Sequence, residues 1–203
     1  MVQININEIM KKAVAVIMSD KKVEDVVRKR ALDKMRSAKE KLLDNFDNHL
    51  VTQEIDAGAD VRSRFLPRGN LFSFIGFSSD DKPTDNIRFV LKDKIRLTYF
   101  PQKRVKSKNS VEFKFIVQQP LLSDIWSVTP FTDGWKSGSW ADDLETRGIS
   151  HFEYYVFDFA FKGNPNSRSG TGLQKPTKVN SSSAGGGIPY IRQLMKEFAR
   201  SFK

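Results

Sequence analysis

A long amphipathic pattern near the N-terminus constrains the fold more than any other feature of the sequence. Between Asp20 and Leu50, apolar residues recur in steps of three and four, which places them on one face of an α-helix. They are Val23, Val26, Val27, Ala31, Met35, Ala38, Leu42, Leu43, Phe46 and Leu50. Asp20 is suited to cap this helix, and Gly58 to end a following segment, Val51–Ala57. A helix of about 30 residues is about 45 Å long, and we expect a β-sheet to pack along it.

The polar face of this predicted helix carries nine basic and seven acidic residues between Asp20 and Asp47. The two signs nearly cancel, which is typical of a solvated face with ion pairs between neighbouring turns. A nucleic-acid-binding face would need one sign to dominate. We therefore interpret the polar side of the helix as solvent-exposed.

The middle of the chain contains candidate strands. Leu71–Phe77 (LFSFIGF) is short and aromatic, which predicts a buried strand or a hydrophobic plug, and Ser78–Asn86 is predicted to be a turn-rich loop. Apolar residues then alternate with period two in Ile95–Phe100 and Val111–Val117, which predicts a hairpin. The tip of that hairpin is basic and contains Lys103, Arg104, Lys106 and Lys108.

The C-terminal part has three distinct segments. His151–Phe161 is apolar at both parities, as in a central strand covered on both sides. Gly163–Gly187 is rich in Gly, Ser and Asn and is predicted to be an arm that a partner orders. Pro189–Phe202 is predicted to be a closing helix with Ile191, Leu194, Met195 and Phe198 on its apolar side.

These segments predict one α+β domain. Residues 1–57 form its helical N-terminal part, residues 58–162 a mainly antiparallel β-sheet, residues 163–187 an extended loop or arm, and residues 188–203 a short C-terminal helix.

Composition excludes several classes of protein. The 203 residues include no cysteine, so disulfide scaffolds, zinc ribbons and thiol nucleophiles are excluded, and the two histidines lie far apart in the sequence. No apolar run is long enough for a membrane span. The lysines before the apolar Ala13–Met18 could suggest a signal sequence, but Glu8 and the short apolar run argue against export. We expect an intracellular or virion protein.

The formal net charge is +10, from 34 basic and 24 acidic residues. After Asp158 the chain has eight basic residues and a single acid, Glu197. This excess predicts an acidic partner for the C-terminal part, either a protein ring or a nucleic acid.

Two nucleic-acid functions have some support in the sequence. Glu112 and Lys114 on one strand, with Asp93 upstream, suit a metal-dependent nuclease, although such residues are also common on the outer face of a half-exposed strand. Trp126, Trp135 and Trp140 could stack single-stranded bases, although most aromatic residues in such a chain belong to the core. A non-enzymatic, basic nucleic-acid-binding protein therefore remains an alternative.

The C-terminal part resembles a known family. The residues concerned are Trp135, Ser139, Trp140, Leu144, Glu145, Gly148, Ile149, Ser150, Phe152, Tyr154 and Tyr155, then Ser167–Gln174, and then Pro189, Tyr190, Ile191, Leu194 and Phe198. This series, within residues 126–203, is similar to the neck and tail-completion proteins of tailed bacteriophages. Within it, Trp135, Trp140, Glu145, Gly148, Ile149, Tyr190 and Ile191 are the most characteristic.

The resemblance implies a structural α+β subunit, with no catalytic site, metal or cofactor, in a ring of about six or twelve copies at the head–tail junction. Its location would be the virion neck or the top of the tail, after synthesis in the host cytoplasm. Expected partners are further copies of the chain, the head connector or head-completion protein, the tail-terminator or tail-tube protein, and DNA in the channel through non-specific basic contacts. The residues expected to contact neighbours are Ser167, Arg168, Ser169, Gly170, Gly172, Gln174, Lys175 and Lys178, with the basic hairpin tip.

Overall fold

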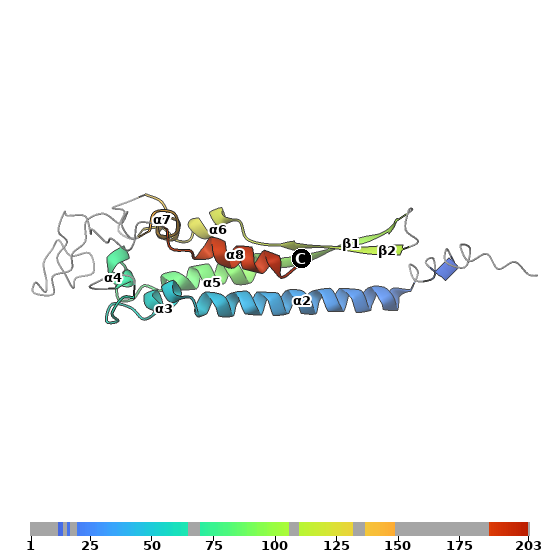
Figure 1. The fold of residues 1–203 in the computed structure, drawn as a ribbon, viewed down its shortest axis with the longest axis horizontal. Coiled ribbons are helices and arrows are strands. Elements are labelled where there is room, and N and C mark those ends of the chain that lie inside the picture. Colours follow the sequence, from blue (N-terminus) through green and yellow to red (C-terminus); the bar gives the residue numbers. More distant parts are fainter. Residues whose placement is uncertain are drawn as a thin grey trace, which may run out of the picture. The chain divides into compact units, whose positions relative to one another are not determined.

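The structure is a computed structural model that describes residues 12–13, 16, 20–64, 70–105, 110–131, 137–148 and 187–202. It has an α+β fold with a long N-terminal helix, an antiparallel hairpin and a short C-terminal helix, so the predicted fold class is confirmed (Figure 1). Its contacts define two compact units. The helix–hairpin unit contains residues 1–39 and 94–119, and the helical unit contains residues 40–93 and 120–203.

The long helix begins where the sequence predicts. Helix α2 spans Lys21–Asp47, and the Asp20 carboxylate accepts a hydrogen bond from the Lys22 backbone N–H at 2.9 Å. This bond satisfies one of the free donors that every helix N-terminus exposes. Helix α2 belongs to the helix–hairpin unit as far as Lys39, and its last turns, from Glu40 on, belong to the helical unit.

The hairpin of the helix–hairpin unit is formed by β1 (Arg96–Val105) and β2 (Ser110–Gln118). Tyr99 pairs with Phe115 and Phe100 with Lys114, and the register is irregular between Phe100 and Lys103. The predicted hairpin is therefore confirmed, with longer strands. The Arg28 guanidinium of α2 lies over the Tyr99 ring, 5.4 Å from its centroid.

The main core lies in the helical unit. It is formed by the end of α2 together with α3 (Leu50–Asp56), α4 (Leu71–Ile75), α5 (Pro83–Lys94), α6 (Leu122–Trp126), α7 (Trp140–Arg147) and α8 (Ile191–Arg200). Phe77 packs edge-to-face on Trp140 with a centroid distance of 5.5 Å, and both side chains are buried. The predicted C-terminal helix is confirmed as α8, whose apolar side chains Ile191, Leu194, Met195 and Phe198 are all buried.

Leu71–Phe77 is not a strand, and this prediction was wrong. Asn70 accepts a hydrogen bond from the Ser73 backbone N–H at 2.8 Å and so begins a helix, α4, which Gly76 ends in a left-handed conformation (φ 97°). Every residue from 71 to 77 is buried, so the alternative prediction of a hydrophobic plug is confirmed.

The prediction of a loop at Ser78–Asn86 was also wrong for its second half, because helix α5 begins at Pro83. Proline is favoured in the first turn of a helix, where its missing N–H costs nothing. Between residues 58 and 148, the described part of the predicted sheet region contains the two hairpin strands and four helices, α4 to α7. The central strand predicted at His151–Phe161 lies outside the described residues.

Arg88 of α5 links three helices of the helical unit. Its guanidinium pairs with Asp47 of α2 at 2.8 Å and with Asp56 of α3 at 3.2 Å, and also with Asp85 of its own helix. The guanidinium also lies over the Phe46 ring, 5.5 Å from its centroid. A planar group with five donors can serve several carboxylates at once, which fixes where α2, α3 and α5 meet.

The carboxylate of Glu54 holds the connector between α3 and α4. It is buried, and it accepts hydrogen bonds from the backbone N–H groups of Arg64 at 3.0 Å and Leu71 at 2.8 Å. The Leu71 N–H is one of the free donors at the start of α4. One side chain therefore fixes both ends of the segment 65–69.

We expect Glu54→Ala to lower the free energy of unfolding by about 1–3 kcal/mol, because the Leu71 N–H, in a buried position, would lose its acceptor. Urea denaturation monitored by circular dichroism would measure the change. The matched control is Glu40→Ala on the exposed face of α2, for which we expect a change within about 0.5 kcal/mol. Equal effects of the two substitutions would contradict this role of Glu54.

Candidate functional site

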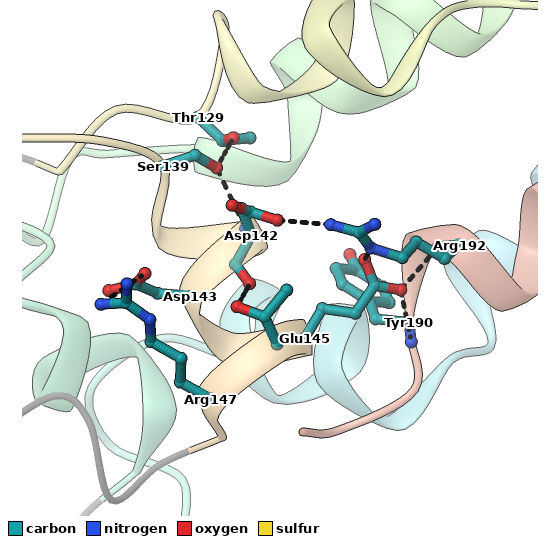
Figure 2. Close-up of polar contacts among 9 residues, drawn as sticks. Thr129, Ser139, Asp142, Asp143, Glu145, Arg147, Tyr190 and Arg192 are labelled. Carbon is teal, nitrogen blue, oxygen red and sulfur yellow. Dashed lines mark hydrogen bonds and ion pairs between the residues drawn. The ribbon is translucent and has the colours of Figure 1, made fainter. Parts of the chain in front are cut away.

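Two described residues of the C-terminal motif, Glu145 and Tyr190, lie at one junction of the helical unit, where α7 meets the start of α8 (Figure 2). We call this junction the α7–α8 clasp and define it by Leu144, Glu145, Gly187, Ile188, Tyr190 and Arg192. The members come from two parts of the chain that are separated by residues 149–186.

The start of α7 is fixed by its cap. The Ser139 hydroxyl accepts a hydrogen bond from the Asp142 backbone N–H at 3.1 Å and exchanges one with the Thr129 hydroxyl at 2.7 Å (Figure 2). The Trp140 backbone N–H donates to the Thr129 carbonyl at 2.9 Å. Because of these bonds the Trp140 side chain points into the core, where it is 1% exposed.

A single carbonyl joins the two separated parts of the chain. The Leu144 carbonyl oxygen accepts hydrogen bonds from the backbone N–H groups of both Gly148, at 3.2 Å, and Ile188, at 3.0 Å. Gly148 ends α7 with φ 68°, a conformation that favours glycine. Gly148 and Ile188, on either side of positions 149–186, are therefore held at one point of the helical unit.

Gly187 completes this contact. A Cβ atom at this position would overlap the carbonyl oxygen of Glu145 and lie 2.7 Å from its carbonyl carbon. Only glycine allows the two backbones to approach this closely.

Glu145 caps the start of α8 from outside that helix. Its side chain is 4% exposed, and it accepts hydrogen bonds from the backbone N–H groups of Tyr190 at 3.3 Å and Arg192 at 2.6 Å (Figure 2). The Arg192 Nε also donates to it at 3.2 Å. Burial raises the pKa of the Glu145 carboxyl, and the bonds from Arg192 and Tyr190 oppose that rise.

Arg192 ties this carboxylate to a second acid and to an aromatic ring. Its guanidinium pairs with Asp142 at 2.7 Å and lies over the Trp126 ring, 5.6 Å from its centroid. The Arg192 side chain is 48% exposed, so its ion pair with Asp142 contributes little to the free energy of unfolding. The pair mainly orients the guanidinium.

Tyr190 connects the clasp to α2 and α3. Its hydroxyl exchanges a 2.8 Å hydrogen bond with the Thr52 hydroxyl, and its ring stacks on Phe46 at 5.9 Å. Complete burial raises the pKa of the Tyr190 phenol, so this hydroxyl stays protonated. The His49 ring lies 4.8 Å from the Tyr190 ring, and its Nδ1 accepts a hydrogen bond from the Val51 backbone N–H as the N-cap of α3.

Five of the seven motif residues named from the sequence are described: Trp140, Glu145, Gly148, Tyr190 and Ile191. Of these, Glu145 and Tyr190 are joined by a hydrogen bond, and Gly148 bonds to the adjacent Leu144 carbonyl. Trp135 and Ile149 lie outside the described residues. So do all the residues predicted to contact neighbours, which are Ser167, Arg168, Ser169, Gly170, Gly172, Gln174, Lys175 and Lys178. In the predicted basic tip, Lys103 and Arg104 lie in β1, and Lys106 and Lys108 are outside the described part.

Arg192, Asp142 and Thr52 are residues of this site that the sequence did not identify as such. A local signal existed for one of them, because Ser139 followed three residues later by Asp142 is a helix N-terminal signature. No local signal exists for the contact of Thr52 with Tyr190, which joins residues 138 positions apart.

The clasp has the chemistry of a structural joint. The two Glu145 oxygens already accept three hydrogen bonds from two backbone N–H groups and one guanidinium, and the Tyr190 hydroxyl is buried against Thr52. Within the described ranges, no three residues of the His, Cys, Asp and Glu types form a group that could hold a metal ion. No described helix has both the length and the apolar character of a membrane span.

Comparisons with known proteins give no relative for this chain: no family model, no curated protein and no solved structure matches it.

We expect Gly187→Ala to disrupt the clasp, because the new methyl group would overlap the Glu145 carbonyl. Overpacking of this kind lowers the free energy of unfolding by about 1–3 kcal/mol, measured by urea denaturation. Gly58→Ala is the comparison, since its Cβ would meet no atom within 4 Å and only its φ of 75° opposes the change. A smaller effect at Gly187 than at Gly58 would show that the clasp is not closely packed.

We expect part of the stability to be lost as the pH falls below about 6.5, because of His49. Burial lowers the pKa of His49, against the opposing effects of a hydrogen bond to the Pro189 backbone and of the Glu197 charge. The unfolded chain therefore takes up this proton first, and stability declines until the pH reaches the lowered pKa. Urea midpoints between about pH 7.5 and 5.5 would measure the decline.

His49→Asn should flatten this dependence, because asparagine caps a helix without titrating in this range. His151→Asn, at the other histidine, should leave the decline in place. The assignment to His49 fails if the His49→Asn variant shows the same pH dependence as the parent protein.

Proposed function

We propose that the protein is a structural subunit of a homo-oligomeric ring at the head–tail junction of a tailed bacteriophage. In this role it joins the head connector to the tail around the channel through which DNA passes. Its partners are further copies of itself and the adjoining connector and tail proteins. The proposal starts from the resemblance carried by residues 126–203, and the α7–α8 clasp supports it.

The observation that carries the proposal is that the described motif residues hold the helical unit together. Trp140 belongs to the core, Glu145 and Gly148 close the clasp, and Tyr190 connects α8 to α2 and α3. These roles are architectural. A motif that serves architecture suits a protein whose function lies in its interfaces with neighbours.

The anchoring of segment 149–186 is a second argument for the proposal. The residues that flank it, Gly148 and Ile188, both bond to the Leu144 carbonyl, so contacts made by the segment would be transmitted to a fixed point of the subunit. Ring subunits commonly exchange segments with their neighbours, and such exchange needs a fixed base in each copy. The Gly/Ser-rich stretch and the predicted contact residues from Ser167 to Lys178 belong to this segment.

Deleting residues 164–185 tests the proposal. Because the clasp holds both ends of the segment, we expect the shortened chain to keep the urea midpoint of the parent protein and to lose the ability to form rings. Native mass spectrometry of nuclease-treated protein at low and high salt would measure assembly, and we expect a salt-resistant oligomer of about six or twelve copies for the parent chain.

The control is an internal replacement of residues 164–185 by a scrambled sequence of the same composition. It should behave as the deletion does if the order of residues in the arm matters for assembly. A parent chain that stays monomeric, both alone and with the adjoining connector or tail proteins, would overturn the proposed function.

A further inference from the structure

The net charge of the protein is concentrated in one of its two units. The helix–hairpin unit contains 17 basic and six acidic residues, whereas the helical unit contains 17 basic and 18 acidic residues. The first unit therefore has a net charge of +11 and the second a net charge of −1. The basic excess at the C-terminal end, noted from the sequence, is balanced by acids elsewhere in the helical unit.

Helix α2 has the same division within it. Over residues 20–47 the basic and acidic side chains nearly balance, but they are unevenly distributed along the helix. Residues 21–39 include eight basic and only three acidic side chains. Most of the eight are exposed, namely Lys21, Lys22, Arg28, Lys29, Arg30, Lys34 and Arg36. Acidic residues follow further along, at Glu40, Asp44 and Asp47, in the part of α2 that belongs to the helical unit.

The hairpin adds basic charge on its exposed face. Strand alternation and register place Arg96, Phe100 and Lys114 on one face, and all three side chains are exposed. The Lys114 amine lies 5.9 Å from the centroid of the Phe100 ring. Leu97, Tyr99 and Phe115 lie on the opposite face, where they are half-buried.

We infer that the helix–hairpin unit binds the phosphate backbone of duplex DNA. The charge extends along 19 residues of α2, about 28 Å, and an extended, evenly charged polyanion is the partner that matches such a surface. A second copy of the same unit would meet it with equal positive charge, which disfavours self-pairing through this surface. This surface deepens the proposed function: its biological setting, the DNA channel, rests on that proposal.

Binding to phosphates has a quantitative signature. Each phosphate contact releases a counterion, so the logarithm of the binding constant falls linearly with the logarithm of the salt concentration, with a slope of about −0.9 per contact. We expect the full-length protein to bind a duplex of mixed sequence with a steep salt dependence and little preference for sequence.

The test compares two triple variants of the full chain, each of which removes three positive charges. Lys22→Gln, Lys29→Gln and Arg30→Gln remove exposed charges from the helix–hairpin unit. The matched control, Lys82→Gln, Lys196→Gln and Arg200→Gln, removes exposed charges from the helical unit. Fluorescence anisotropy with a labelled duplex of about 30 base pairs, over a series of salt concentrations, gives Kd and the salt slope.

We expect the first variant to raise Kd at least about tenfold at moderate salt and to reduce the salt slope by about two to three units, and the control to change Kd less than about twofold. Equal losses in the two variants, or no salt-dependent binding by the parent protein, would overturn the inference. So would displacement of the duplex by polyglutamate at equal charge concentration, which indicates a site for acidic protein. Tighter binding of single strands would also overturn it, because that outcome indicates base stacking.

Oligomeric state distinguishes this inference from the proposed function. Native mass spectrometry without DNA reports ring formation alone, and the first variant should assemble like the parent protein. Binding of the duplex by a protein that never assembles would support the DNA-binding surface and contradict the ring. Ring formation without DNA binding would do the reverse.

Discussion

The rest of the helical unit depends on the joint between two chain segments that lie far apart in the sequence, made by the Leu144 carbonyl and the Glu145 carboxylate. A buried carboxylate is unfavourable unless donors surround it, and here the donors are the free N–H groups at the start of α8 and the Arg192 guanidinium. The raised pKa of Glu145 records the remaining cost of its burial. The same bonds that offset this cost orient α8, so that its apolar side faces the core.

Glu54 uses the same device on a smaller scale. Both glutamate side chains are buried, and each accepts hydrogen bonds from two backbone N–H groups that lie ten or more residues further along the chain. In both cases at least one donor belongs to the start of a helix whose own cap is incomplete without it. Carboxylates therefore do here what disulfides do in small secreted domains: they hold the ends of connecting segments together. This use of glutamate suits a chain that contains no cysteine.

The division of charge gives the two units different physical characters. The helical unit is nearly neutral and contains the aromatic core, whereas Ile95 is the one buried side chain among those whose burial is described in the helix–hairpin unit. An isolated two-stranded hairpin is only marginally stable in water, and the repulsion that comes with a net charge of +11 lowers the stability of this unit further. An anionic partner relieves that repulsion, so binding would stabilise this unit more than the helical one.

The sequence by itself determined the features that depend on local periodicity and capping. The stripe from Val23 to Phe46, the alternation in Val111–Val117 and the apolar side of α8 each have a period that only one secondary structure satisfies, and all three predictions are confirmed. Leu71–Phe77 was mistaken for a strand because a short apolar run has no period, and only the cap at Asn70 and the turn at Gly76 decide for a helix. Tertiary structure alone decided the rest. The motif residues Glu145 and Tyr190 were visible in the sequence, but their roles depend on contacts with Arg192 and Thr52, and no local rule relates residues so far apart. Likewise, only the fold shows that the basic first part of α2 and its more acidic end belong to different units.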